Sequence, residues 1–580
     1  MDIRKILHRE TKNTLSAAFV VAFSFCLSAV LGILRDRLLA GRFGADENLD
    51  VYFAAFRIPD FIYGLVITGG LTAAFLPILS EYLNRTDAND SSNSPVIWPD
   101  GGQSMVNGVL TCFSLVLLIS CGLLFILTPI IVRLIVPGFS DSQISMAVIL
   151  TRIMFFSPLI LGISNIVSGV LQYFNRFLSY SLAPIFYNLG IIIGILFFVP
   201  LIGLSGLAWG VVAGALLHLL IQIPAFSSSG FHFAPILKFN HPALKKIFKM
   251  MVPRIIGQAS YHFNLVFVTA IASTLVSGSI AVFNYANNLQ WFPVGMIGVS
   301  FAVAAFPDLS RYWASRRYDD FIRDLFVSLK QMIFLIVPVS VLMLFLRAQI
   351  VRLVLGTGRF GWMETRLTAA SLGIFAFGIL AASLIPLLTR AFFSLKDTRT
   401  PVIVSIGATA INLLLSVSLV KILAAGLDGF LSRNEIIASV SAFLRIDGLD
   451  HIEVVALPVA LMISSVFQAL LLWFLLPRKI VQESGSLNAG WQTAVGLLVK
   501  SAVKIAVCAS LMAIVVYLSL NIVGGFVDMR TFNGVFLQTA VSGLAGLLSY
   551  LFVAYLLRSE ELSAIKKTII NRGLKISVGR

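Results

Sequence analysis

Charged residues are scarce in this sequence. Only 12% of its 580 residues are Asp, Glu, Lys or Arg, whereas 58% are hydrophobic and the mean hydropathy is +0.93. Soluble globular domains carry about 25% charged residues. The composition therefore excludes an ordinary soluble protein and predicts an integral membrane protein.

Cysteine is also scarce, and its distribution excludes two kinds of site. The four cysteines lie singly inside apolar segments and form no paired C-x-x-C spacing. A disulfide framework and a structural zinc site both need grouped cysteines. We expect neither a metal site nor a cofactor.

The distribution of basic residues excludes a nucleic-acid partner. Lys and Arg number 43 against 27 Asp and Glu, which gives a net charge of +16. The basic residues form short clusters beside apolar runs, the pattern that orients membrane helices. Both ends of the chain carry such clusters on the side predicted to be cytoplasmic, so we expect both termini in the cytoplasm.

Long apolar runs are abundant. With about 20 apolar residues per span, the sequence holds about fourteen candidates, and none alternates as the strands of a membrane barrel do. The predicted fold is an all-α integral membrane protein with two six-helix lobes and two C-terminal helices. The first run is too long for a signal peptide and is expected to be a membrane helix. The candidate spans are approximately 14–40, 51–82, 105–134, 143–173, 179–200, 204–226, 247–277, 279–312, 325–355, 364–394, 401–425, 453–477, 492–522 and 531–557.

A short internal repeat predicts the domain organisation. The second span ends in "AAFLPILSEY" at residues 73–82, and the eighth ends in "AAFPDLSRY" at residues 304–312. Repeated halves are common in transporters, whose binding site lies between them. We predict an N-terminal lobe at residues 1–228 and a C-terminal lobe at 229–480, followed by two more spans and a basic tail at 481–580.

An insertion at residues 426–452 separates spans 11 and 12. Its segment "SRNEIIASVSAFLRI" places Ser432 three residues before Glu435, which is the spacing of a helix capping box. The pattern predicts a short helix on the outer membrane surface.

Ionisable residues in spans 1 and 2 are the strongest candidates for a binding site. A charge near the bilayer centre costs about 2.5–3.5 kcal/mol, so such charges normally face protein or water. Arg57 and Asp60 stand on one face of span 2 around Pro59, while Arg35 and Asp36 close span 1. The alternative is a self-neutralising Arg57–Asp60 pair whose arginine reaches the outer interface.

Polar residues also recur in spans 7 and 8. Arg254, Gln258 and His262 follow one another at four-residue intervals and so share one helix face. Asn287 and Asn288 bring amides into span 8, where hydrogen bonds between helices are the alternative role. A cationic, amide-lined cavity suits a diphosphate, because arginine holds phosphate oxygens through paired N–H donors.

Three further patterns have simpler interpretations. Lys500 and Lys504 are one turn apart in span 13 and are predicted to contact lipid headgroups or to reach the interface. The acids of "GADENLD", which include Asp50, admit the hypothesis of a polyprenyl-linked glycosyltransferase, but no external domain accompanies them. The "GTGRFG" at residues 356–361 matches a dinucleotide fingerprint without its strand–helix context, so it indicates a turn.

Several segments resemble the MurJ (MviN) family of lipid II flippases in bacterial peptidoglycan synthesis, within the multidrug/oligosaccharidyl-lipid/polysaccharide exporter superfamily. The resemblance runs in order from span 1 to span 12. It implies an alternating-access flippase of the bacterial plasma membrane, not an enzyme, which carries lipid II to the outer leaflet among membrane lipids. It also implies that the last two helices form a groove for the polyprenyl tail, and we expect a monomer. The segments are "LGILRDRLLAGRFG", "AFRIPDF", "GGLTAAFLPILSEY", "QYFNRF", "YANNLQWFPVGMIGVS" and "SLKDTRTP".

The family's charged positions are only partly kept. They match at Arg35, Arg57 and Asp50, and we expect Asp36, Asp50 and Asp60 to orient the arginines or to form gate contacts. Arg254 is the predicted replacement for missing cations. The family's charges are absent at Ala29, Tyr63, which follows the family's "PN" turn, Thr68 and Asn288.

The losses leave alternatives open. One is a flippase for another polyprenyl-linked saccharide, and another is a multidrug exporter of the same superfamily, which needs an acidic cavity for organic cations. Spans 7, 11 and 12 offer amides and hydroxyls but no buried carboxylate for sodium or a proton. We therefore predict that transport depends on membrane potential acting on a charged cavity.

Overall fold

The computed structural model describes most of the chain. Its described residues are helical, without a β-strand among them, which confirms the all-α fold. Eleven helices of the described part are long and apolar enough to cross a membrane, and they match predicted spans 3 to 6 and 8 to 14. The total of about fourteen stays a prediction. The described residues are 14–65, 75–76, 78–80, 100–236, 242–425, 439, 442–446, 451–484, 489–564 and 566.

The chain forms two compact units, residues Met1–Ala281 and Val282–Arg580. The predicted lobe boundaries at residues 228 and 480 rest on the sequence repeat and stay a prediction. Most of the insertion at 426–452 lies outside the described residues, and so does most of its predicted surface helix.

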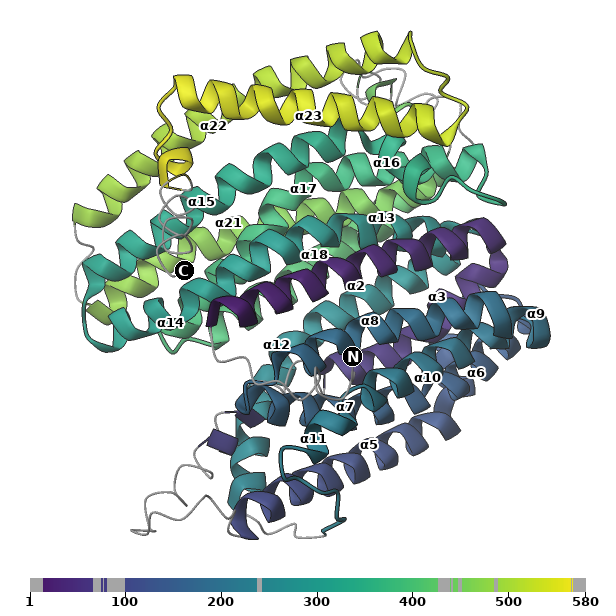
Figure 1. Ribbon diagram of the computed structural model, residues 1–580. Coiled ribbons are helices and arrows are strands. Elements are labelled where there is room, and N and C mark those ends of the chain that lie inside the picture. Colours follow the sequence, from purple (N-terminus) through teal and green to yellow (C-terminus); the bar gives the residue numbers. More distant parts are fainter. Residues whose placement is uncertain are drawn as a thin grey trace, which may run out of the picture. The chain divides into compact units, whose positions relative to one another are not determined.

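Unit 1 is a bundle of helices. In Figure 1, α2 runs beside α8, and α10 lies against α8 in the same bundle. The helices are α2 (Thr14–Phe43), α3 (Glu47–Ile62), α5 (Asp100–Ile135), α6 (Asp141–Met154), α7 (Phe156–Tyr173), α8 (Phe177–Ile193), α9 (Val199–Ile202), α10 (Ser205–Leu220), α11 (Ile223–Ser227) and α12 (Pro242–Ser273), with a π-helix η2 (Gly194–Phe198).

Local sequence signals explain where several of these helices begin. The Asp46 side chain accepts the Leu49 N–H at 3.0 Å and caps α3. Ser140 and Gln143 form a reciprocal capping box at the start of α6. These caps satisfy backbone donors that have no partner within the helix.

Glycines set the close packing of α8 against α10. A Cβ atom on Gly190 would lie 2.2 Å from the Cα of Gly214, and one on Gly194, in the π-helix η2 that continues α8, would lie 2.5 Å from the Cα of Gly210. The two helices therefore meet backbone to backbone. Small residues at four-residue spacing favour this contact in membranes, where helices gain little from hydrophobic association.

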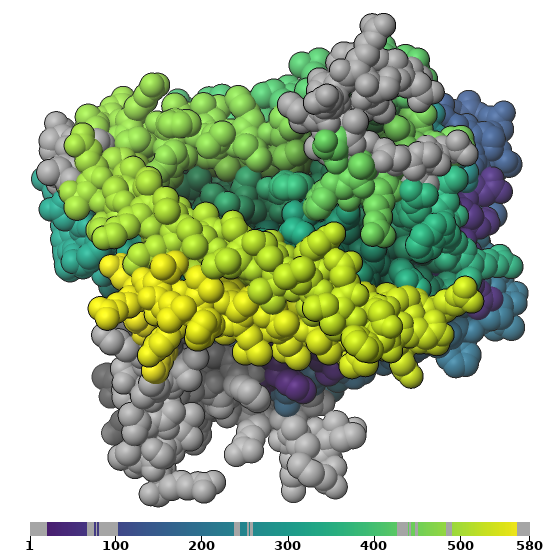
Figure 2. Space-filling view, turned by 90° about the horizontal axis from the view of Figure 1, so that it is seen from above, coloured from purple at the N-terminus to yellow at the C-terminus, as the bar shows by residue number. Residues whose placement is uncertain are grey.

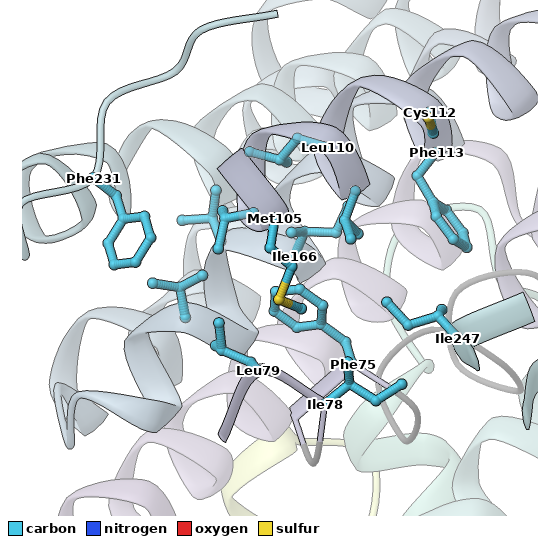
Figure 3. Packing of buried hydrophobic residues seen from close by; sticks show 14 of the residues in the cluster. Phe75, Ile78, Leu79, Met105, Leu110, Cys112, Phe113, Ile166, Phe231 and Ile247 are labelled. Carbon is cyan, nitrogen blue, oxygen red and sulfur yellow. The ribbon is translucent and has the colours of Figure 1, made fainter. Parts of the chain in front are cut away.

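An apolar cluster holds the other side of unit 1. Figure 3 shows Phe75, Met105, Ile166, Phe231 and Ile247 packed together, from segments far apart in the sequence. The cluster includes a residue of the "AAFLPILSEY" segment, Phe75, whose ring lies directly over Gly169 of α7. It fixes the end of span 2 against α5, α7 and α12.

Unit 2 contains the remaining spans. The C-terminal helices α22 and α23 run side by side along one face, as Figure 2 shows, and α22 packs on α15. Tyr550 of α23 donates a hydrogen bond to the Phe334 carbonyl of α15 at 2.9 Å. The helices are α13 (Ser279–Pro293), which straddles the boundary, α14 (Ser300–Ala314), α15 (Tyr318–Phe345), α16 (Arg347–Val354), α17 (Trp362–Ser394), α18 (Arg399–Ala424), α21 (Ala456–Ser484), α22 (Ala489–Gly524) and α23 (Phe532–Leu556), with a π-helix η3 (Val294–Val299) and a 3-10 helix η4 (Ile452–Val455).

Spans 2 and 8 share a local departure from α-helix geometry. The backbone becomes π-helical at residues 63–65 in span 2 and at Val294–Val299 in span 8. Gly64 and Gly295 occupy equivalent positions when the two "AAF" triplets of the repeat are aligned. The repeat therefore includes a shared feature of backbone geometry. π-Helical turns are rare and occur frequently at functional sites.

A buried carboxylate ties α22 to the end of α23. Glu561 accepts hydrogen bonds from the Ser501 hydroxyl at 2.5 Å and the Ser559 hydroxyl at 2.6 Å. Burial opposes ionisation of this carboxyl, but the hydrogen bonds outweigh it and lower the pKa of Glu561. The ionised side chain therefore stabilises the C-terminal pair.

This arrangement predicts a pH dependence. Because the pKa is lower in the folded state, the stabilisation is present at neutral pH and is lost as the pH falls through the folded-state value. We expect Glu561→Gln to lower the melting temperature of the purified protein at pH 7. The effect should shrink as the pH falls below the ordinary glutamate value of about 4 and should vanish only below the lower folded-state pKa. Equal melting temperatures at pH 7 would contradict this role.

Candidate functional site

A cavity lined by both polar and apolar side chains lies inside unit 1. Its volume is about 280 Å³, and its walls come from α2, α3, α7, α8 and α10, together with Tyr63, which follows α3. Aromatic and proline side chains form its apolar part. The polar residues that line it are Arg35, Asp60, Tyr63, Ser157, Tyr187 and His218.

Arg35 is held in place at the wall of this cavity. Its Nε and Nη2 atoms donate to Asp36 Oδ1 at 3.0 and 2.8 Å, and Nη1 donates to Asn188 Oδ1 at 3.1 Å. Asn188 in turn donates to the carbonyls of Ser28 and Pro184. The guanidinium is therefore positioned by its neighbour on α2 and by α8, as a binding arginine requires.

Arg57 and His262 come together between α3 and α12. Arg57 Nε donates to the Thr269 hydroxyl of α12 at 2.8 Å. The His262 ring lies edge-on to Phe61, with 6.2 Å between the ring centres, and lies against Gly64 so closely that a Cβ there would be 1.9 Å from Nε2. Both residues are next to Asp60, on which their charges act.

Asp50 is hydrogen-bonded to the backbone at the start of another helix, and its predicted gate or orienting role stays a prediction. Its Oδ2 accepts the Gly278 N–H at 2.7 Å and its Oδ1 accepts the Ala281 N–H at 2.8 Å, so the carboxylate caps the start of α13. Gly278 has a φ of +91°, and a Cβ there would lie 2.1 Å from the Ala45 carbonyl oxygen. Only glycine fits this contact between the start of α3 and the turn after α12.

We expect Asp50→Ala to lower stability by about 2 kcal/mol, the upper end for a lost helix cap, because two backbone donors lose their acceptor. Asp50→Asn keeps one acceptor oxygen and should lose less. Thermal unfolding of the purified variants measures the effect, with Asp46→Ala as a matched cap on α3. A melting temperature of Asp50→Ala equal to that of the wild type would contradict the assignment.

The acidic loop has no arrangement that indicates a glycosyltransferase. Asp46 caps α3, Asp50 caps α13, and the Glu47 carboxylate accepts from the Gln143 amide at 3.5 Å. Each acid of "GADENLD" has a local structural contact. The described residues also hold no group of three or more His, Cys, Asp or Glu side chains that could bind a metal ion.

Other predicted site residues lie elsewhere. The side chains of Arg254 and Gln258 are outside the described residues. Asn287 and Asn288 belong to unit 2, where Asn287 is buried and accepts from Gln290 at 2.9 Å, whereas Asn288 is exposed. Their predicted contact with the substrate stays a prediction.

The two lysines of α22 differ from each other. Lys504 Nζ donates to the carbonyls of Leu557 at 2.9 Å and Arg558 at 3.5 Å, so it caps the C-terminal end of α23, where a positive charge is favoured. Lys500 is exposed. The predicted contact of both lysines with lipid stays a prediction.

The sequence analysis missed a hydrogen-bonded chain that ends at the cavity. Ser168 Oγ donates to Gln222 Oε1 at 2.7 Å, and Gln222 Nε2 donates to Ser164 Oγ at 2.8 Å. The Ser164 hydroxyl proton is then available for His218 Nδ1, which lies 2.7 Å away. This order favours the neutral His218 tautomer with its proton on Nε2.

A signal for this chain exists in the sequence. His218 and Gln222 are four residues apart in span 6, and Ser164 and Ser168 are four apart in span 4. The same spacing drew attention to span 7, because residues four apart share a helix face. Tyr187 carried no comparable signal.

A multispan α-helical protein with a membrane-depth arginine, carboxylate and histidine around a cavity is a membrane transporter by fold and site. The family model described as "Lipid II flippase MurJ" matches residues 39–427. The chain belongs to the MurJ family of lipid II flippases.

Individual relatives agree with the family model. The probable lipid II flippase MurJ of Buchnera aphidicola subsp. Acyrthosiphon pisum is 29% identical over 408 residues, which cover 70% of this chain and 78% of the relative. The lipid II flippase MurJ of Burkholderia cenocepacia is 27% identical over 413 residues, covering 69% and 77%.

Solved structures share the fold. A lipid II flippase MurJ in an inward closed conformation has a TM-score of 0.69 at 22% identity and covers 93% of this chain and 98% of its own. An inward-facing multidrug resistance MATE transporter of the MOP superfamily has a TM-score of 0.59 at 13% identity, covering 79% and 96%. Likeness at such identity concerns the fold alone.

Proposed function

We propose that this protein is a lipid flippase of the bacterial plasma membrane. It moves lipid II, a polyprenyl-diphosphate-linked glycan, from the cytoplasmic to the outer leaflet by alternating access. Both termini face the cytoplasm, and the protein acts as a monomer. Family membership supports this proposal, and within the structure the observation that carries it is Arg35, fixed at the wall of a cavity inside unit 1.

The chemistry of the cavity agrees with a diphosphate ligand. Arg35 already has one carboxylate partner, Asp36, and a diphosphate that approached it would compete for donors that point to a single Asp36 oxygen. Arginine binds phosphate oxygens through paired donors more tightly than a neutral group does. Arg57 provides a second positive charge on α3, the helix that also carries Asp60.

The alternative of a multidrug exporter has weaker support. Its substrates are organic cations, which need acidic walls, whereas Arg35 and Arg57 bring positive charge to this part of unit 1. The likeness to MATE transporters concerns fold alone. No observation on the described residues favours this second function.

Complementation tests the proposed function. Cells depleted of their own lipid II flippase should grow when they express this chain at the membrane. The test also examines the prediction that Arg254 replaces missing family cations, since Arg254→Ala should then fail to support growth. Growth with Arg254→Ala but not with Arg35→Ala would end the replacement hypothesis, and no rescue by the well-expressed wild type would contradict lipid II as the substrate.

A further inference from the structure

Asp60 differs from the other acids of unit 1 in its contacts. Asp36 is paired with Arg35, and Asp50 accepts two backbone N–H groups. Among the described residues, the Asp60 carboxylate makes no hydrogen bond and no ion pair within 4 Å. It nevertheless lines the cavity, in the helix α3 of a membrane span.

Three other polar groups of the cavity wall already have partners. Arg35 is bonded to Asp36 and Asn188, and the Tyr63 hydroxyl is bonded to Asn165. His218 Nδ1 is bonded to Ser164. Among the described residues, Asp60 is therefore the acidic group of this wall that has no hydrogen-bond or ion-pair partner, with Arg57 and His262 as its charged neighbours.

A carboxylate at membrane depth costs free energy unless it is paired or neutralised. A proton neutralises it without further ligands. A metal cation needs several oxygen ligands, and the described residues hold no group of three or more His, Cys, Asp or Glu side chains that could surround one. The surroundings therefore favour a proton over sodium.

We propose that Asp60 is a proton-binding group and that proton uptake and release at this cavity are coupled to lipid transfer. This inference rests on the proposed function. The cavity has room for on the order of nine water molecules at about 30 Å³ each. A hydronium ion there gives its proton to the carboxylate and becomes water, and the carboxyl later returns the proton to a water molecule.

The charged and titratable groups around Asp60 lie on several neighbouring helices of unit 1. His262 is the second protonatable group nearest to the same turn, since it lies against Gly64, one turn after Asp60. Because the two side chains interact through their charges, the protonation of His262 depends on the charge of Asp60. Among the described side chains, the set is Arg35 on α2, Arg57 and Tyr63 in span 2, Tyr187 on α8, His218 on α10 and His262 on α12.

Proton coupling also agrees with the predicted dependence on membrane potential. A proton that enters from outside moves with both the pH gradient and an inside-negative potential. The family's "PN" turn carries an uncharged amide where this chain has Asp60, so Asp60→Asn is the natural test substitution. It keeps the size of the side chain and removes the protonatable oxygen.

The experiment uses the full-length chain in vesicles that contain fluorescent lipid II, with a membrane-impermeant quencher to follow transfer. The measured quantity is the ratio of transfer rates with and without an imposed pH gradient, acidic on the outer side. We expect a ratio of several-fold for the wild type and a ratio near one for Asp60→Asn, whatever its basal rate. Asp141→Asn, an exposed acid at the start of α6, should keep the wild-type ratio.

A second measurement does not depend on transport. Infrared difference spectra of the purified protein between two pH values should contain a protonated-carboxyl band that is missing in Asp60→Asn. A wild type that transfers lipid II at the same rate with and without the gradient would overturn the proton coupling and leave the proposed function intact. Absence of any lipid II transfer would overturn the proposed function, and the infrared band would still decide whether Asp60 binds a proton.

Discussion

Arg35→Ala is expected to abolish growth of cells that depend on this protein as their lipid II flippase. The guanidinium lines the cavity of unit 1 and is the arginine there whose position is fixed by both a carboxylate and an amide. Loss of a charged contact to a diphosphate costs about 3 kcal/mol, which corresponds to roughly a hundredfold loss of binding. We expect a loss of that size to leave too little transport for growth.

The variant needs two companions, because removal of Arg35 also leaves Asp36 without its partner. Arg35→Ala with Asp36→Asn removes the unpaired charge and should remain inactive if the arginine binds substrate. Arg35→Lys keeps the charge but not the paired donors, so it should recover only part of the function. Arg133→Ala, whose side chain is 69% exposed, is the matched control and should support growth.

Growth of the double variant at normal expression would show that Arg35 is needed only to neutralise Asp36. Growth of Arg35→Ala itself would remove Arg35 from the binding site altogether. Membrane levels of each variant, measured by immunoblot, separate loss of function from loss of protein.

Gly210→Leu is expected to disrupt unit 1. The α8 and α10 backbones are so close that a Cβ on Gly210 would lie 2.7 Å from the Cα of Gly194. An overpacked core normally costs about 1–3 kcal/mol, and here the obstacle is backbone that cannot rotate away, so we expect about 3 kcal/mol or more. Because α8 and α10 both contribute to the cavity wall, transport should fall with stability.

Gly122→Leu on α5 is the control for this prediction. A Cβ on Gly122 meets no atom within 4 Å, so the larger side chain should be tolerated. The measurement is the melting temperature of the detergent-purified variants. Equal melting temperatures for Gly210→Leu and Gly122→Leu would show that the close approach of α8 and α10 does not limit stability.

Much of the fold is readable from the sequence because the bilayer imposes it. A membrane span must satisfy its backbone groups internally and remain apolar over about 20 residues, so runs such as 179–200 and 364–394 reappear as α8 and α17. The internal repeat also predicted a relation between spans 2 and 8. Their shared π-helical geometry around Gly64 and Gly295 depends on hydrogen-bond spacing that the apolar pattern does not record.

The candidate site was predictable only in part. Arg35, Asp36 and Asp60 could be identified because ionisable residues in a membrane span are costly. Their partners could not, because Asn188 and Tyr187 meet them through helix packing between residues about 150 positions apart. The use of Asp50 as a cap for α13 also depends on the turn at Gly278, far along the chain.

Lys504 illustrates the same limit. Its place near the end of a span predicted contact with lipid headgroups, and the sequence contains nothing to distinguish that from another use. In the fold its ammonium group caps the last carbonyls of α23. The sequence shows that a positive charge lies near the end of span 13. Which group that charge contacts depends on how α22 and α23 pack.

The central claim is that this chain moves lipid II between leaflets and holds its diphosphate at Arg35. The most direct measurement is the rate at which fluorescent lipid II changes leaflet in vesicles that contain the purified protein, read with a membrane-impermeant quencher. We predict transfer well above protein-free vesicles for the wild type and for Arg133→Ala, and a rate close to the protein-free background for Arg35→Ala with Asp36→Asn. A wild-type rate equal to that of protein-free vesicles, or full activity of the double variant, would contradict the account.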